Sequence, residues 1–414
     1  MQTNELVQKE LAIFSVTDQA KLLSAILYTA HYQKFPIAIW RLPEGSEFHV
    51  IIDFSTSQKR VKTDLEEMGS GFVVSPFSNG GGAWFIQADM YLSGTFEEAT
   101  PARLSFSYES EQYLSEKNYR KNIFLKALNE VFSRSVIPQI SLSAVPSAVH
   151  TEEVNFEETV AKAVQEIRNG TFRKVVLSRY KKATLPADFE IIPTFKKISA
   201  SYPTAFVSLV SSSETGTWIG ATPEILVSLD KDKIFRTMAL AGTQAKGTQT
   251  NMSEVLWTQK EIEEQALVSR YIINCLKKIR VREFEEIGPK TVASGNLLHL
   301  RTDFEIDTNE INFPQLGTVM LELLHPTSAV CGMPKKEALD FIEANEQYDR
   351  SLYSGYLGQV NMGGESRLFV NLRCMQLFDK RAIVYAGAGI TQDSNPQKEW
   401  QETEMKMDTM LRLI

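Results

Sequence analysis

The stretch TEEVNFEETVAKAVQEIRNGTFRKVVLSRY, residues 151–180, decides the class of fold. Its first twenty residues open with Thr and acidic side chains and close on Gly170, as helices prefer at their two ends. The nine residues that finish the stretch, FRKVVLSRY, predict a strand. We therefore expect a helix that leads almost directly into a strand.

Similar strand-like segments recur along the chain after residue 180. Many of them are joined by short turns instead of helices, which favours antiparallel pairing over a doubly wound parallel sheet. Strands and long helices together predict an α+β fold. The predicted strands are 204–210, 224–229, 233–239, 354–361, 367–377 and 382–386, and the predicted long helices are 252–280, 334–345 and 395–413.

The part of the chain before residue 151 also mixes helices and strands. A helix is predicted from Asp18, strands at 36–40 and 48–54, and a long amphipathic helix at 112–135. The Pro- and Ser-rich segment 135–150 carries no Asp, Glu, Lys or Arg, so it is the predicted connector to the second part of the chain.

Composition excludes several classes of protein. The 414 residues exceed the needs of one small core and suggest two or three domains. A net charge of -7 opposes association with nucleic acid or anionic lipid. The chain has no run of 18 apolar residues and no signal-peptide pattern, and its three cysteines form no CxxC. We expect a cytoplasmic protein without nucleic-acid or membrane partners.

Two E-x-x-E pairs stand out in the predicted helices, Glu261 with Glu264 and Glu399 with Glu402. Residues three apart share a helix face, and each pair lies in line with apolar residues that belong inside. Carboxylates that face a core require a neutralising cation, and oxygen ligands suit Mg²⁺. From spacing alone, two solvated helix faces remain the alternative.

Lys174 and Glu224 are candidates for acid/base chemistry. Strand alternation places Lys174 on the face of apolar Phe172 and Val176, where desolvation would lower its pKa toward the range of a general base. Glu224 opens an apolar strand after a Gly/Pro turn, where burial would raise its pKa and keep it a proton donor. The alternatives are a lysine at a sheet edge with a solvated head and an ordinary strand-start glutamate.

Polar residues and glycines interrupt several other apolar strands. Gly242 and Thr243 in LAGTQ and Gly387 and Gly389 in YAGAGI allow close backbone approach, and their N–H groups can receive a carboxylate. By alternation, Arg373 in FVNLRCMQL lies on one face of a strand and could bind a carboxylate. His299, between leucines, is either a core histidine or a catalytic one.

The order of these segments resembles that of the chorismate-utilising enzymes, the group that includes isochorismate, salicylate, anthranilate and aminodeoxychorismate synthases. The resemblance covers roughly residues 151–414, whereas residues 1–150 match in length and general character alone. In order, the segments are KVVLSR, GATPEILV, LAGT, KEIEEQALV, LLHL, HPTSAVCGMP, SGYLGQV, FVNLRC, YAGAGI and NPQKEWQET.

The resemblance implies one large α+β unit in place of separate domains. In that family, two stacked and largely antiparallel β-sheets are surrounded by helices, and the active site lies between the sheets. Residues 1–150 would be a variable N-terminal portion packed into this unit, and residues 151–414 the catalytic portion that binds chorismate.

The resemblance also implies roles for individual residues. Glu264 and Glu402 would bind Mg²⁺ directly, with Glu261 and Glu399 nearby. Lys174 would activate water for attack at C2 of chorismate, and Glu224 would protonate the C4 hydroxyl as it leaves. The metal would hold the ring carboxylate. The remaining substrate-binding positions would be Arg373, Gly387, Lys406, Gly242, Thr243, His299 and Ala329.

Two alanines indicate the branch of the family. Ala241 stands where aminodeoxychorismate synthases carry a lysine nucleophile, and Ala329 stands where anthranilate and salicylate synthases usually carry Thr. The resemblance therefore implies an isomerase, a Mg²⁺-dependent isochorismate synthase that serves menaquinone or siderophore biosynthesis without a glutamine amidotransferase subunit. The alternatives are a salicylate synthase and a non-catalytic chorismate-binding paralogue.

Overall fold

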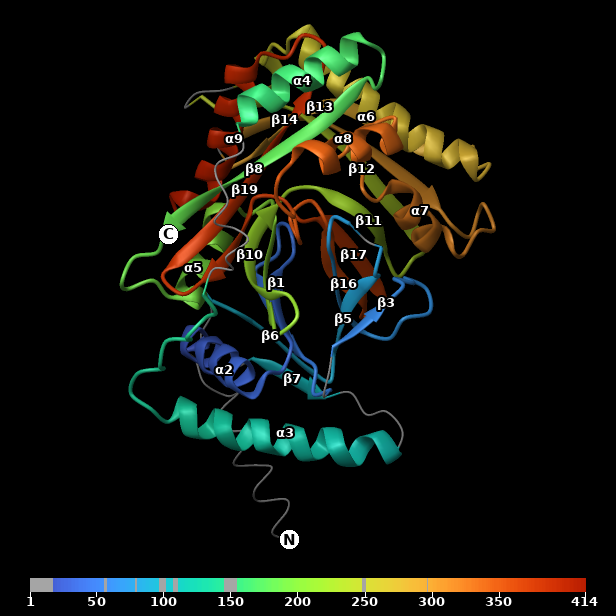
Figure 1. The fold of residues 1–414 in the computed structure, drawn as a ribbon. Helices are drawn as coiled ribbons and strands as arrows, with labels where there is room; N and C mark the ends of the chain where they lie inside the picture. The colour runs from blue at the N-terminus through green and yellow to red at the C-terminus, as the bar shows by residue number, and fades with distance from the viewer. Residues whose placement is uncertain are drawn as a thin grey trace.

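Two stacked antiparallel sheets with helices on their outer faces make up the fold, as Figure 1 shows. The structure is a computed structural model, which confirms the predicted α+β class. Aromatic residues from both sheets fill the layer between them; the rings of Phe206 and Phe369 stack with centroids 4.1 Å apart. The structure describes residues 18–55, 58–78, 80–96, 102–106, 111–144, 155–247, 251–295 and 297–414.

The first sheet has ten strands, and each neighbouring pair is antiparallel. The four strands at one end of this sheet come from residues before 107, and the other six come from residues after 173. In spatial order the strands are β15 (Gly332–Met333), β8 (Lys174–Thr184), β19 (Arg381–Ile390), β18 (Cys374–Phe378), β10 (Gly216–Thr222), β9 (Phe206–Ser212), β1 (Ile37–Arg41), β2 (Glu47–Ile52), β6 (Met90–Thr95) and β7 (Arg103–Phe106).

The second sheet has nine strands and the same antiparallel pairing. Register shifts interrupt the pairing of β12 with β14 between Ala241 and Gln244, where Gly242 and Thr243 of the LAGT segment lie. In spatial order the strands are β13 (Glu285–Ser294), β14 (Leu297–Asp307), β12 (Ile234–Ala245), β11 (Ile225–Leu229), β17 (Glu365–Val370), β16 (Tyr356–Met362), β4 (Gly71–Ser75), β5 (Ala83–Gln87) and β3 (Lys59–Val61).

The N-terminal portion supplies strands to both sheets. β1 pairs with β9 in the ten-stranded sheet, with Ile37 opposite Ser211. β4 pairs with β16 in the nine-stranded sheet, with Val74 opposite Leu357. Backbone hydrogen bonds therefore join residues before 151 to the later part of the chain in each sheet.

The helices lie in two groups. One group packs with the outer face of the ten-stranded sheet around a core that includes Phe124 and Met407, and the other shares a core with β8, β12 and β17. No helix of the described residues is long and apolar enough to cross a membrane. The first group is α2 (Gln19–Gln33), α3 (Glu111–Phe132), α5 (Ile191–Ser201) and α9 (Pro396–Leu411); the second is α4 (Phe156–Arg168), α6 (Gln259–Lys278), α7 (Leu316–Leu324) and α8 (Lys335–Asn345).

Several element boundaries differ from the sequence-based expectation. The helix expected from residue 151 begins at Phe156, because the side chain of Asn155 caps it by accepting a hydrogen bond from the Glu158 N–H; residues 151–154 lie outside the described residues. The single strand expected at 367–377 is two strands, β17 and β18. The chain crosses there from one sheet to the other.

Candidate active site

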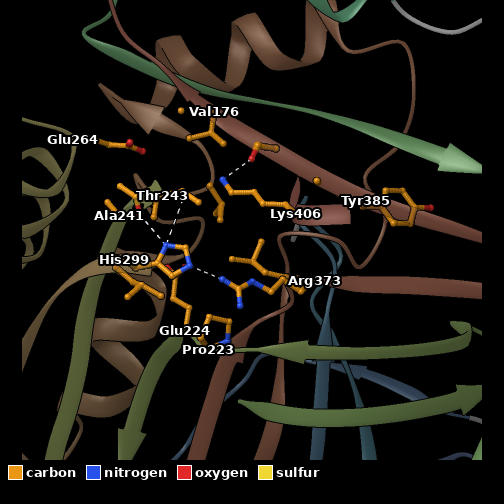
Figure 2. A pocket seen from close by; sticks show the side chains of 18 of the residues that line it. Val176, Pro223, Glu224, Ala241, Thr243, Glu264, His299, Arg373, Tyr385 and Lys406 are labelled. Carbon is orange, nitrogen blue, oxygen red and sulfur yellow. Dashed lines mark hydrogen bonds between the residues drawn. The ribbon is translucent and has the colours of Figure 1, made fainter. Parts of the chain in front are cut away.

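A cavity lies where the ends of both sheets meet α6 and α9, and most of the predicted site residues line it (Figure 2). Glu261, Glu399, Glu402 and Lys174 are not among the lining residues. The predicted residues that line the cavity are Glu224, Gly242, Thr243, Glu264, His299, Ala329, Arg373, Gly387 and Lys406. The structure thus brings together side chains from positions 224 to 406.

Lys174 is fully buried on β8, and its Nζ donates a hydrogen bond to Glu264 Oε1 at 2.9 Å. The alternative of a solvated edge lysine is therefore wrong. Burial would raise the pKa of Glu264, but the ammonium groups of Lys174, Lys406 and Lys260 outweigh it and hold that pKa below its usual value. Glu264 is a carboxylate that faces the cavity with a lysine behind it.

Gly389, one of the two glycines that the sequence indicated in YAGAGI, makes room for this ion pair. A Cβ at residue 389 would lie 2.4 Å from Glu264 Oε1 and 3.0 Å from Lys174 Cε. The sequence carried one sign of this role, the second glycine of YAGAGI. Only the tertiary structure, in which the Glu264 side chain reaches from α6 to Gly389 on β19, shows why a side chain cannot fit there.

Glu224 lies at the start of β11 and is 4% exposed. Burial raises its pKa to about 7, although Lys174, Lys406 and Arg373 pull the value down. This agrees with the expectation of a raised pKa. A carboxyl that is protonated near neutral pH can donate a proton inside the cavity.

Arg373 lies between β17 and β18 with φ 47°, so its predicted place on a strand face is wrong. The crossing between sheets turns the backbone there. Its Nη1 donates to Ser294 Oγ at 2.5 Å, and its Nη2 lies 2.5 Å from His299 Nε2. Burial lowers the pKa of the guanidinium to about 10, which leaves it charged at neutral pH.

His299 orients Arg373 from β14. Its Nδ1 lies 2.8 Å from the carbonyl oxygen of Gly242, which can only accept, so Nδ1 carries the proton. Nε2 is then free to accept from Arg373, as the dashed lines of Figure 2 trace. Burial and the nearby guanidinium hold the pKa of His299 well below its usual value. The ring is therefore neutral and faces the cavity.

Lys406 points into the cavity from α9. Its Nζ donates to the carbonyl oxygen of Gly387 at 2.9 Å and to Glu402 Oε1 at 2.7 Å. A Cβ at Gly387 would lie 3.0 Å from the hydroxyl of Tyr353, another lining residue. Sequence reasoning missed Tyr353 and Tyr385, whose ring centroids lie 5.4 Å apart in a stacked pair, because tyrosines in or beside apolar strands look like ordinary core residues.

Gly242, Thr243 and Ala329 complete the wall of the cavity. Gly242 has φ +69°, and a Cβ there would lie 3.1 Å from Glu261 Cβ. The Thr243 hydroxyl lies 3.5 Å from His299 Nδ1. The N–H of Ala329 donates to Thr327 Oγ1 at 3.2 Å, so its small methyl side chain is what it offers to the cavity.

The four predicted metal-site glutamates each have a partner within the protein. Glu261 accepts a hydrogen bond from the Thr258 N–H at 2.8 Å and so caps α6. Within the described parts of the chain, no group of three or more His, Cys, Asp or Glu is gathered as for a metal ion. The other three pair with lysines: Glu264 with Lys174, Glu399 with Lys260 and Glu402 with Lys406.

These carboxylates nevertheless suit a hard divalent cation in their chemistry. They come from facing helices, and Glu399 Oε2 is buried without a hydrogen-bond partner. Burial raises the pKa of Glu399, with Lys260 opposing and Glu402 reinforcing that shift, so the two carboxylates influence each other. The donor set of Glu264, Glu399 and Glu402 fits Mg²⁺, provided that the lysines paired with these carboxylates move away from them.

Comparison with known proteins places this arrangement in a family. Isochorismate synthase EntC of Escherichia coli (strain K12) is 29% identical over 279 residues, which cover 66% of this chain and 70% of that protein. Isochorismate synthase DhbC of Bacillus subtilis is 30% identical over 276 residues, which cover 64% of this chain and 68% of that protein.

The fold has solved counterparts as well. The structure of MenF, the menaquinone-specific isochorismate synthase from Escherichia coli, superimposes with a TM-score of 0.72 at 22% identity and covers 94% of this chain and 90% of that one. The model of the family described as chorismate binding enzyme matches residues 100–414. The chain therefore belongs to the family of chorismate binding enzymes.

Proposed function

We propose that this chain is a Mg²⁺-dependent isochorismate synthase, which interconverts chorismate and isochorismate. The observation that carries the proposal is a buried glutamic acid, Glu224, in the wall of the cavity, together with a buried lysine, Lys174, directly behind the lining residue Glu264. Such a pair can take a proton from water on one side and give a proton to a leaving hydroxyl on the other. The names of the relatives support the same activity.

The proposed reaction adds one water and removes another. The reaction requires Lys174 as the neutral amine, so the ammonium that pairs with Glu264 in the structure must first give up a proton. As the neutral Nζ of Lys174 then accepts a proton from water, the water oxygen bonds to C2 of chorismate and the ring double bonds shift. The C4–O bond breaks, and the proton of Glu224 passes to the departing hydroxyl, which leaves as water. Lys174 ends protonated and Glu224 ends as a carboxylate, so one proton passes back between them for the next cycle.

Positive charge on two sides of the cavity suits a substrate with two carboxylates. Arg373, held by Ser294 and neutral His299, presents a buried guanidinium to the enolpyruvyl carboxylate. Glu264, Glu399 and Glu402 would hold Mg²⁺, whose charge would bind the ring carboxylate. Lys406 adds a further ammonium to the cavity wall.

Small residues set the branch of the proposed chemistry. Ala241 lines the cavity where a covalent lysine would stand, so water is the nucleophile and no ammonia-supplying amidotransferase subunit is needed. We propose menaquinone biosynthesis as the pathway served; a siderophore is the alternative. Proteins of both kinds occur among the relatives, as in menaquinone-specific MenF and a vibriobactin-specific isochorismate synthase of Vibrio cholerae.

Product analysis tests the proposal. Purified protein incubated with chorismate and MgCl₂ should yield isochorismate on chromatography, and EDTA should abolish the conversion. Anthranilate formed with ammonia, or salicylate with pyruvate, would assign a different activity. Chorismate binding without any product would indicate a non-catalytic paralogue.

A lysine variant tests the mechanism. Lys174→Ala should lower kcat by about 10²- to 10⁴-fold with KM for chorismate little changed, because the variant lacks the proposed general base. Lys182→Ala, at an exposed position on the same strand, is the matched control and should behave as the parent. Parent-like turnover of Lys174→Ala would remove Lys174 from the mechanism.

A further inference from the structure

Lys260, in the first turn of α6, connects that helix to α9. Its Nζ lies 2.5 Å from Glu399 Oε1, across 139 positions of sequence. The side chain of Glu399 is 1% exposed and that of Lys260 is 27% exposed, so the contact is largely out of water. Lys260 takes no part in the proton transfers of the proposed reaction.

The negative charge of the carboxylate cluster converges on Lys260. Burial lowers the pKa of this lysine, but the fields of Glu399, Glu402 and Glu264 outweigh burial and raise it above its usual value. The second oxygen of Glu399, Oε2, is buried and has no hydrogen-bond partner. Glu399 Oε1 is thus paired with the ammonium of Lys260, whereas Glu399 Oε2 is buried and is available to another ligand.

We propose that Lys260 is an internal counter-ion that neutralises Glu399 in the metal-free protein and competes there with the divalent cation. The inference rests on the metal site of the proposed function. Lys260 would be a positioning residue: it holds α6 and α9 together when the metal is absent, and it sets how tightly the metal binds.

The physical reason is that an ammonium and a divalent cation compete for one set of carboxylates. With Lys260 in place, an incoming cation meets a positive charge at Glu399 and must displace it or tolerate the repulsion. Without Lys260, Glu399 has no counter-ion in the metal-free protein and is repelled by Glu402, and a cation relieves that repulsion. Loss of this charge should therefore weaken the metal-free fold and strengthen metal binding, two effects of opposite sign.

Calorimetric titration with MgCl₂ in the absence of chorismate tests this inference on Lys260→Gln. We expect Mg²⁺ to bind about tenfold or more tightly than to the parent, and the Tm in EDTA to fall by about 2–4 °C. Addition of Mg²⁺ should then raise Tm by more than in the parent. Lys260→Arg keeps the charge and should stay close to the parent in both measurements.

Lys278→Gln is the matched control, since Lys278 is an exposed lysine at the other end of α6. Equal or weaker Mg²⁺ binding by Lys260→Gln with parent-like circular dichroism overturns the inference, as does an equal gain in Lys278→Gln. Lys260→Met, which keeps the packing of the stem, replaces the glutamine variant if that variant does not fold. Isochorismate formation by the parent is assayed separately. A failure of the proposed function is therefore distinguished from a failure of the inference about Lys260.

Discussion

Glu224 shows how one buried carboxyl can link pH to both activity and stability. Its pKa is raised to about 7 by burial, and its ordinary value is 4.5. Between these two values the folded protein holds a proton that the unfolded chain releases. The free energy of unfolding therefore falls as pH rises from about 4.5 to about 7, and the proton donor is lost over the upper part of that range.

The first prediction concerns the stability of the protein between the two pKa values of Glu224. Relative to Glu224→Gln, the parent should lose up to about 3 kcal/mol of stability between pH 4.5 and pH 8, because a glutamine does not ionise. Urea unfolding at pH 5 and pH 8 measures the difference. Glu214→Gln, at an exposed position, is the control and should leave the pH dependence as in the parent. Identical pH dependence in Glu224→Gln and the parent would contradict a raised pKa.

The same residue should control turnover. The kcat of the parent for isochorismate formation should fall as pH rises through about 7, because the ionised carboxylate has no proton to give. Glu224→Gln should lower kcat by about 10²-fold or more at pH 6.5, where the parent still holds its proton. A pH profile of the parent that stays flat from pH 6 to pH 8 would remove Glu224 from the role of general acid.

At the scale of elements, the pairing of β8 with β19 sets the geometry of the site. Gly389 lies opposite Val176 in this pair, directly beside the ion pair of Lys174 and Glu264. The absent side chain at 389 is what lets α6 place its carboxylate against the buried lysine. β19 thus shapes the site because it has no side chain at Gly389.

Gly389→Ala should therefore disturb the site without a strained backbone. The added methyl group would meet Glu264 Oε1 at 2.4 Å, so the carboxylate and Lys174 must move. We expect a loss of about 1–3 kcal/mol in stability and at least about tenfold in kcat. Gly69→Ala, where a Cβ would meet nothing within 4 Å, is the control. Unchanged kcat in Gly389→Ala would show that the ion pair tolerates displacement.

At the scale of the whole molecule, each sheet is completed by strands from the N-terminal portion. β1 covers the edge of β9, and β4 covers the edge of β16. Without them, two long strands with apolar residues would present unpaired N–H and C=O groups, which promote aggregation. The sequence alone suggested a boundary near residue 150, yet the sheets continue across it.

A fragment of residues 155–414 should consequently not fold by itself. We expect it to aggregate or to lack a cooperative thermal transition, measured by size-exclusion chromatography and circular dichroism. Co-expression with a fragment of residues 1–144 is the control, since it restores the missing strands and should recover some soluble complex. A monomeric and cooperatively unfolding 155–414 fragment would contradict this view.

Local patterns predicted much of the site because burial follows from strand and helix periodicity. Alternation on β8 placed Lys174 inward, and the turn before β11 placed Glu224 at the head of a buried strand, as the structure shows. Alternation failed for Arg373, because the chain leaves one sheet for the other at that point and its φ becomes positive. A strand pattern cannot reveal where the chain changes sheets.

The sequence by itself determined the α+β class, most of the helices and strands, the family and the residue types of the site, since these depend on local periodicity and on the order of short segments. Tertiary structure alone decided which charges meet. Lys174 contacts Glu264 across 90 positions, and Lys260 contacts Glu399 across 139. Such pairs depend on how distant elements pack, and the spacing of residues along the chain carries no record of that packing.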